Sequence, residues 1–158
     1  MGASAGIVIL FRWMHLIAAA LAIGGVFFMR VVLPAGLKAV APEPREQVFL
    51  KCRRVFKMVI HSCILLLLIS GIYNSVRLFG QYRADPPLLH GLWGGHILLA
   101  LVVFGISLWL LAGKEPPASH RTWALFNLLL LLAIVAVAST LKTAREAAQH
   151  GPVVQTTR

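Results

Sequence analysis

Residues 7–34 read IVILFRWMHLIAAALAIGGVFFMRVVLP, and this stretch decides the fold class. It is apolar over more than the roughly 20 residues that a helix needs to cross a bilayer. Three further segments have the same character, which places the predicted spans at about 7–34, 56–79, 88–113 and 123–141. Because the connections are short, the sequence predicts an all-α, four-helix transmembrane bundle with up-down-up-down order, in a single domain of residues 1–158.

The composition is that of a membrane protein. Hydrophobic residues make up 59% of the chain and the mean hydropathy is +0.83, both above the values of soluble domains. The first span is too long for the apolar part of a signal peptide and lacks a small-residue cleavage site, so we expect it to stay in the mature protein. The net charge of +10 fits basic residues that flank membrane helices. We therefore expect a lipid bilayer, and no nucleic acid, as a partner.

The lysines and arginines predict the orientation of the bundle. Nine of the 15 fall on the face with the first and third connections: Arg30, Lys38, Arg45, Lys51, Arg53, Arg54, Lys57, Lys114 and Arg121. The other six fall on the opposite face: Arg12, Arg77, Arg83, Lys142, Arg145 and Arg158. The positive-inside rule puts the first face in the cytoplasm. Both termini and the 81–87 loop are then predicted to face the periplasm of a bacterial-type inner membrane.

Helix boundaries are predicted from prolines and polar runs. The Ala41–Pro44 stretch, Ala-Pro-Glu-Pro, is expected to end any helix, and Arg45 to begin one that runs into the second span. The polar tail Thr143–Arg158 is expected to fray.

Two histidines lie inside apolar spans, where an ionisable side chain is costly and usually does functional work. His15 is eight residues past Ile7, and His96 is eight residues past Leu88. The first and third spans start at the same membrane face. Both imidazoles are therefore predicted about 12 Å below that face, at about 1.5 Å per residue. Two histidines at one depth, on helices that can lie diagonally in a bundle, fit the axial ligands of a b-type haem.

Small residues stand beside both histidines. Three alanines share a helix face with His15 and two glycines precede His96: Ala18, Ala19, Ala22, Gly94 and Gly95. They can leave space for a flat cofactor. They can equally serve close helix packing, with each histidine a hydrogen-bonded structural residue.

Other polar residues are assigned secondary roles. Arg12 and Arg83, at the outer boundary, are predicted to pair with haem propionates. His61 and His120, near the cytoplasmic face, could hold a second haem; His61 is alternatively a buried polar residue or a lone metal or quinone contact. His90 is assigned to the interface, with replacement of His96 as ligand left open.

Copper is the rival metal. The methionines at positions 1, 14, 29 and 58 form no cluster of the thioether ligands that select Cu(I). Cys52 and Cys63 belong to no C-x-x-C-H motif, which excludes covalent c-type haem. The chain also lacks an H-E-x-x-H motif, a phosphate loop and a serine-nucleophile setting.

The first span resembles the first helix of the CopD/HemJ-like membrane proteins. Shared features are an aromatic residue with a nearby histidine, a small-residue stretch, an apolar-Gly pair and an arginine, in Arg12–Leu16 and Ile23–Arg30. Similar patterns follow in the other spans: Arg53-Arg54 with Met58 and Gly71, Gly91-Leu92-Trp93 with His96, and Arg121, Phe126-Asn127, Ile134-Val135 and Lys142. The resemblance covers all four spans.

The two branches of this family imply different functions. HemJ proteins oxidise protoporphyrinogen IX and bind haem b through a first-helix histidine, which matches His15; CopD proteins are associated with copper uptake. His96 stands where the HemJ branch has a lysine, and Leu128 and Leu130 or their neighbours stand where it has an acid and a proline. These departures favour a bis-His cytochrome. Small four-helix dihaem b-type cytochromes have a similar architecture.

The sequence thus predicts a haem b-binding redox protein, with one haem and a second left open. It would pass electrons between a quinone or a partner protein and an acceptor at the outer face. A HemJ-type oxidase, which would be an enzyme, and CopD-type copper transport are the alternatives. A homo-oligomer and a subunit of a respiratory complex are both open.

Overall fold

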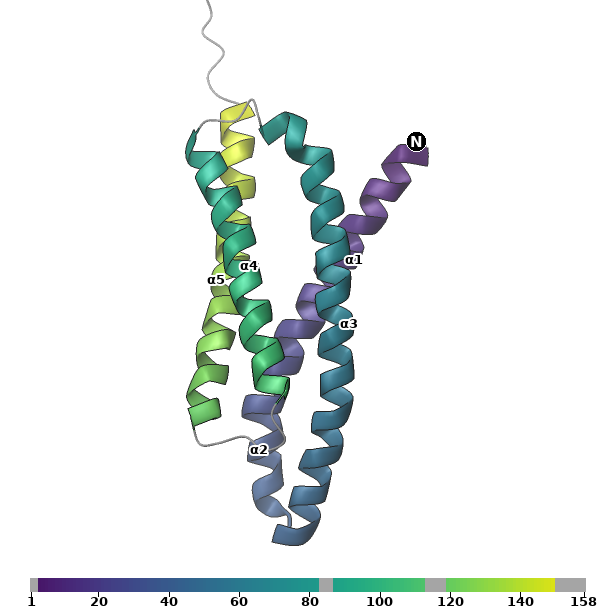
Figure 1. Ribbon diagram of the computed structural model, residues 1–158, viewed down its shortest axis with the longest axis vertical. Coiled ribbons are helices and arrows are strands. Elements are labelled where there is room, and N and C mark those ends of the chain that lie inside the picture. The colour runs from purple at the N-terminus through teal and green to yellow at the C-terminus, as the bar shows by residue number, and fades with distance from the viewer. Residues whose placement is uncertain (1–2, 83–86, 113–118, 150–158) are drawn as a thin grey trace, which may run out of the picture.

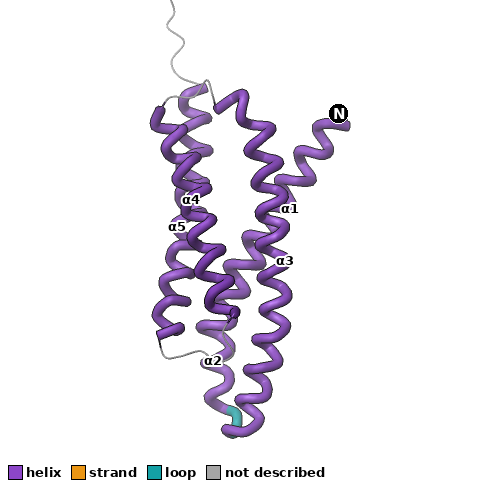
Figure 2. Tube along the Cα trace, in the orientation of Figure 1, coloured by secondary structure: helices purple, strands orange, loops and turns teal. Residues whose placement is uncertain are grey.

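The computed structural model describes residues 3–82, 87–112 and 119–149 of the chain. The first span is one long helical segment in four parts: α1 (Ala3–Phe27), a π-helical turn η1 (Phe28–Val32), α2 (Leu33–Gly36) and a 3-10 turn η2 (Leu37–Ala39). Three helices follow: α3 (Pro42–Tyr82), α4 (Pro87–Ala112) and α5 (Ser119–Gln149). The helices run alternately down and up (Figure 1), with one short loop between η2 and α3 (Figure 2). The predicted all-α, four-helix bundle is confirmed.

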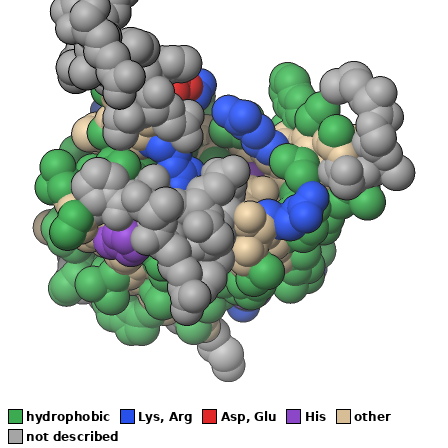
Figure 3. Space-filling model, turned by 90° about the horizontal axis from the view of Figure 1, so that it is seen from above, with side chains coloured by type: hydrophobic (Ala, Val, Ile, Leu, Met, Phe, Trp, Pro, Cys, Tyr) green, Lys and Arg blue, Asp and Glu red, His purple; other side chains and the backbone are tan. Residues whose placement is uncertain are grey.

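All four segments are long and apolar enough to cross a membrane: Ala5–Ala39, Pro42–Arg77, Pro87–Ala112 and Thr122–Ala147. Only 17% to 28% of the most apolar window of each is buried inside the bundle. Most of the apolar side chains therefore face outward. In the end-on view, hydrophobic side chains form the flanks and lysines and arginines gather on the end face (Figure 3). The chain is a multi-pass membrane protein whose surroundings are a lipid bilayer.

Two helix boundaries differ from the sequence-based expectation. α3 begins at Pro42 rather than Arg45, because the first turn of a helix does not use its own N–H groups and so accepts both prolines. α5 continues to Gln149 rather than fraying from Thr143. Its last turns contain strong helix formers, and Lys142 and Glu146 form an ion pair of 3.8 Å one turn apart.

The π-helical turn in the first span has a local cause. Pro34 has no N–H group and cannot donate to the Arg30 carbonyl, four residues earlier. The helix widens here, and the Leu33 N–H bonds to the Phe28 carbonyl, five residues back. Arg30 therefore lies in a local geometry that occurs frequently at functional sites.

The helices associate in two pairs. α1 packs mainly against α3, and α4 packs mainly against α5. The pairs meet through smaller contacts of α1 with α5 and of α3 with α4. Each helix therefore has two neighbours, and α1 lies diagonally across the bundle from α4.

The tightly packed core occupies only part of the bundle length. Its buried members run from Ala18 to Val26 in α1, from Ile60 to Leu67 in α3, and include Val103, Leu111 and Leu131. All of these residues lie on the cytoplasmic side of His15 and His96, in the orientation predicted above. We call the opposite end, where α1 and α4 begin and α3 and α5 end, the histidine end.

Candidate functional site

The His15 imidazole is held from α3. Its Nδ1 lies 2.8 Å from Oγ of Ser70. The Ser70 hydroxyl donates its one proton to the Leu66 carbonyl, 2.6 Å away, so it can only accept from His15. His15 Nδ1 therefore carries the ring proton and Nε2 keeps a lone pair. Metal-ligating histidines share this feature, because their second nitrogen donates to an orienting partner.

Aromatic stacking strengthens the α1–α3 pair beside His15. The Phe11 and Tyr73 rings stack with centroids 3.9 Å apart and planes 15° apart. Phe11 lies one turn before His15, and Tyr73 one turn after Ser70. A methyl group added at Gly71 would lie 3.8 Å from His15 Cε1, which is ordinary contact. The ring is thus fixed on the α3 side with little free space there.

His96 is held from α5 in a corresponding way. Its ring interacts with the backbone of Ile134. Its Nδ1 is buried and has no hydrogen-bond partner among the described residues, so Nε2 makes the contact with Ile134. The Ile134 N–H is used within α5, so its carbonyl accepts and His96 Nε2 carries the proton. His96 Nδ1 is left with a buried lone pair, and an unmet buried acceptor costs free energy.

The two histidines lie near each other inside the bundle. They project from diagonal helices, and their rings lie close enough for their charges to interact. Each ring has one nitrogen engaged by a neighbouring helix and one with a lone pair. This arrangement offers two nitrogen donors to an occupant of the space between the helix pairs.

Side-chain packing is incomplete at the histidine end. Between the level of His15 and the histidine end, Leu89 is the one fully buried side chain among those described. Other side chains of this part, such as Leu92 and Val137, are only half-buried. Protein interiors are normally close-packed, so the side chains at this end are packed less completely than those of the core.

The small residues near the histidines do not form a slot. Ala18 and Ala22 are buried in the core, where they let α1 and α3 approach closely. Gly94 and Gly95 are exposed on the outside of α4. Ala18 and Ala22 therefore serve helix packing, which is the alternative that the sequence left open.

The other predicted ligands lie apart from this pair. Arg12 is exposed one turn before His15, and Arg83 lies outside the described residues. His61 is exposed, and its Nδ1 donates to the Lys57 carbonyl at 2.6 Å. His120 belongs to α5, but its side chain is outside the described part. His90 is exposed at the start of α4. The structure does not bring His61 into the bundle interior.

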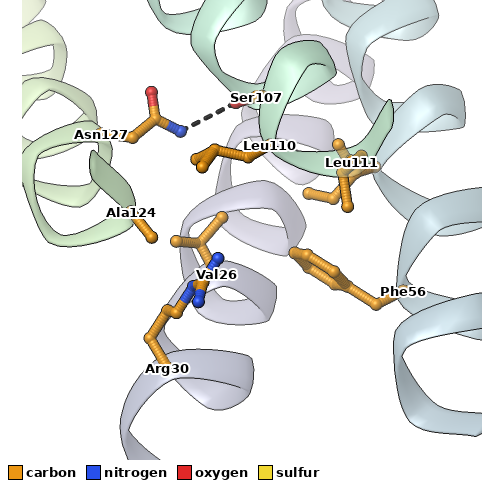
Figure 4. A pocket seen from close by; sticks show the side chains of 9 residues that line it. Val26, Arg30, Phe56, Ser107, Leu110, Leu111, Ala124 and Asn127 are labelled. Atoms are coloured by element: carbon orange, nitrogen blue, oxygen red, sulfur yellow. Dashed lines mark hydrogen bonds between the residues drawn. The ribbon is translucent and has the colours of Figure 1, made fainter. Parts of the chain in front are cut away.

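A second polar group lies toward the end of the bundle opposite to the histidine end. Asn127 of α5 donates through Nδ2 to Oγ of Ser107 in α4, at 2.8 Å, and both side chains are buried. They border a cavity of about 30 Å³, with Arg30 and Phe56 on its other side (Figure 4). This volume is large enough for a water molecule. The Ser107–Asn127 bond joins α4 to α5 where the core is tightest.

Sequence reasoning missed two of the site residues. Ser70 is a lone serine in the apolar run 64–72, directly before Gly71, and such serines commonly bond across membrane helices. That signal could have found it. Ile134 contributes only its backbone, and a backbone contact of this kind cannot be recognised from the amino-acid sequence.

The described residues form no cluster of the ligands that a copper site would need. Within residues 3–82, 87–112 and 119–149, no three side chains of His, Cys, Asp or Glu converge as they would around a metal ion. Met14 is half-buried beside His15, and Met29 is buried at the other end of α1. The His15–His96 pair is the nitrogen-donor arrangement that the described residues offer.

Comparisons with known proteins give a relative without an assigned function. An uncharacterized protein of Aquifex aeolicus (strain VF5) is 29% identical to this chain, over 80% of this chain and 89% of the relative. No protein-family model matches the chain. No solved structure matches it. The chain is thus similar to a protein of nearly the same extent, and its function has to be argued from the site.

Proposed function

We propose that the protein is a haem b-binding redox protein of the membrane, with His15 and His96 as the two axial ligands. The observation that carries this proposal is the pair of imidazoles on diagonal helices. Each has one nitrogen engaged by a neighbouring helix and one nitrogen with a lone pair. Neutral imidazole is a normal axial ligand of haem iron.

The surrounding residues would set the properties of the site. Ser70 and the Ile134 carbonyl orient the two rings and raise the basicity of the ligating nitrogens. Leu89 and the half-buried side chains at the histidine end lower the local dielectric. Arg12, which is exposed one turn before His15, would pair with a propionate at the boundary. Haem b, when bound, supplies reversible one-electron chemistry at a potential that these groups tune.

The proposal includes the orientation of the protein in the membrane. With the histidine end toward the periplasm of a bacterial inner membrane, the site would lie near the outer face. A quinone or a membrane partner protein would donate electrons, and an acceptor at the periplasmic surface would take them. Pure electron transfer is favoured over protoporphyrinogen oxidation because His96 replaces the lysine expected of the oxidase branch.

Optical spectroscopy of the full chain, purified in detergent, tests this function. We expect a low-spin spectrum with a split α/β region on reduction, and reduction of the bound haem by a soluble quinol analogue. Oxidation of protoporphyrinogen IX at a rate well above that of free haem would instead assign the protein to the oxidase class. Stoichiometric copper with no haem would contradict both redox functions.

Replacing Ser70 by alanine is expected to lower haem affinity about 10- to 100-fold while leaving the low-spin spectrum intact. The variant removes the acceptor that fixes the His15 ring but retains both ligating nitrogens. Haem titration of the apoprotein measures the change. Ser70→Thr should restore the affinity, and Ser62→Ala, an exposed serine on the same helix, is the matched control. Equal affinities for Ser70→Ala and Ser62→Ala would remove Ser70 from the site.

Replacing His61 by alanine is expected to leave the haem content and spectrum unchanged. His61 is exposed and bonds to its own helix, at a depth far from His15 and His96. The haem-to-protein ratio of the variant checks this. A variant that loses all haem would contradict the ligand assignment.

A further inference from the structure

Arg30 is a cation at the end of a membrane span, and none of the described carboxylates, in residues 3–82, 87–112 and 119–149, lies beside it. It is half-buried in the π-helical turn, and its charge interacts with that of Arg53 in α3. The described acidic side chains are remote: Glu43 and Glu46 are exposed at the start of α3, and Glu146 pairs with Lys142 near the histidine end. A partly desolvated cation next to a second cation favours binding of an anion close to it.

Arg30 separates the water-sized cavity at Asn127 from a larger groove on the outside of the bundle. The groove has a volume of about 250 Å³ and is lined by Arg30, Val31, Pro34, Ala35, Lys38 and Leu125. Its walls come from η1, α2 and η2 on one side and from α5 on the other. It therefore combines two cations with an apolar lining.

The lower wall of this groove is held in place by the connection to α3. The Arg45 guanidinium donates to the Val40 carbonyl at 2.8 Å and to the Lys38 carbonyl at 3.4 Å. These bonds fix the turn that carries Lys38. The cations of the groove are thus presented by a defined backbone.

The groove lies at the level of lipid headgroups. Arg30 is 15 residues past His15, or about 22 Å further along the helix axis at about 1.5 Å per residue. Added to the roughly 12 Å depth expected for His15, this puts Arg30 at the far boundary of a hydrocarbon core about 30 Å thick. On the bilayer side the groove adjoins apolar side chains that are well exposed: Phe27, Val31 and Leu125.

We propose that this groove binds one anionic diacyl phospholipid. Arg30 and Lys38 contact its phosphate, and its acyl chains lie along Phe27, Val31 and Leu125. Basic pockets at the cytoplasmic ends of membrane helices have the charge that such headgroups require. A soluble phosphate would use the two cations but leave the apolar flank without a role, so the structure favours the lipid. The proposal is independent of haem binding.

Native mass spectrometry of the full chain tests the lipid site, with phosphatidylglycerol and phosphatidylcholine of identical acyl chains as probes. We expect preferential binding of phosphatidylglycerol. Each cation near the surface contributes a factor of about five, so Arg30→Gln/Lys38→Gln should weaken this binding about 30-fold. Arg54→Gln/Lys57→Gln removes the same charge from exposed positions outside the groove and is the matched control.

Three outcomes would overturn the lipid site. One is equal loss of binding in the control and in the Arg30/Lys38 variant, because general surface charge would then explain it. Another is displacement of the bound lipid by glycerol phosphate, which lacks acyl chains, since that would identify a site for soluble anions. The third is an unchanged lipid affinity of the single variant Lys38→Gln. Because Lys38 is exposed, this variant should fold even if variants of Arg30 do not. Unchanged affinity in this variant would exclude the groove.

Discussion

The variant His15→Ala is expected to lower the haem-to-protein ratio at least about tenfold. It removes a ligating nitrogen and leaves Ser70 without the N–H that it accepts. His15 is also the ring held more firmly, between Ser70 and the stacked Phe11–Tyr73 pair. The measurement is the ratio of haem absorbance to protein after purification from haem-replete cells.

Rescue by imidazole separates loss of a ligand from loss of the fold. His15→Gly leaves space for a free imidazole, which should restore a low-spin spectrum if the variant still forms the bundle. Helical content by circular dichroism and the elution position should match those of the wild type. A His15→Ala protein with full haem content and an unchanged spectrum would mean that His15 is a structural residue bonded to Ser70.

The variant His96→Ala is expected to keep part of its haem but to convert it from low spin to high spin. His15, with its serine support, still provides one axial nitrogen, and the sixth position opens. The change appears as a shifted Soret band and as high-spin signals in electron paramagnetic resonance. An added small ligand such as azide should bind to the variant and not to the wild type, in which both positions are filled.

The matched control for this variant is His90→Ala. His90 is exposed on the same helix, six residues earlier, and its replacement should leave the spectrum low-spin. If His90→Ala opens the sixth position and His96→Ala does not, the ligand assignment on α4 is wrong. The Nδ1 of His96, which has no partner among the described residues, would then be a structural feature only.

The architecture of the bundle was predictable because a chain that crosses lipid has to satisfy its backbone hydrogen bonds internally, as a helix does. Four apolar runs separated by short polar connections allow few other arrangements. The pairing of α1 with α3 and of α4 with α5 depends on side-chain packing and does not follow from this requirement. The π-helical turn at Arg30 was missed although Pro34 is visible in the sequence, because a proline can end, kink or widen a helix.

The sequence predicted that His15 and His96 form a pair, but not which residues surround them. Equal spacing from the start of two spans brought His15 and His96 to one level, and the structure puts them on diagonal helices. Ser70 and Ile134, which orient the rings, follow from the relative rotation of neighbouring helices, which sequence spacing does not set. The alanines near His15 could be assigned either to packing or to a slot, and only the packed structure separates the two.

The two ends of the bundle differ in how completely their side chains are packed. Tight packing in the part away from the histidine end, with the Ser107–Asn127 bond between α4 and α5, holds the four helices together. The histidine end is packed less completely, so an enclosed group there need not disturb the core. Stability and cofactor binding would then depend on largely separate sets of residues. Core variants such as Asn127→Ala should affect the melting temperature more than the haem spectrum.

The most direct test of the central claim is a pyridine haemochrome assay on the wild-type chain, combined with protein quantification by amino-acid analysis. We predict haem b at about one per chain after expression with ample haem supply, as expected for a single bis-His site. Protein that carries no haem under these conditions would contradict the redox function, and copper handling would then be the leading explanation of the His15–His96 pair.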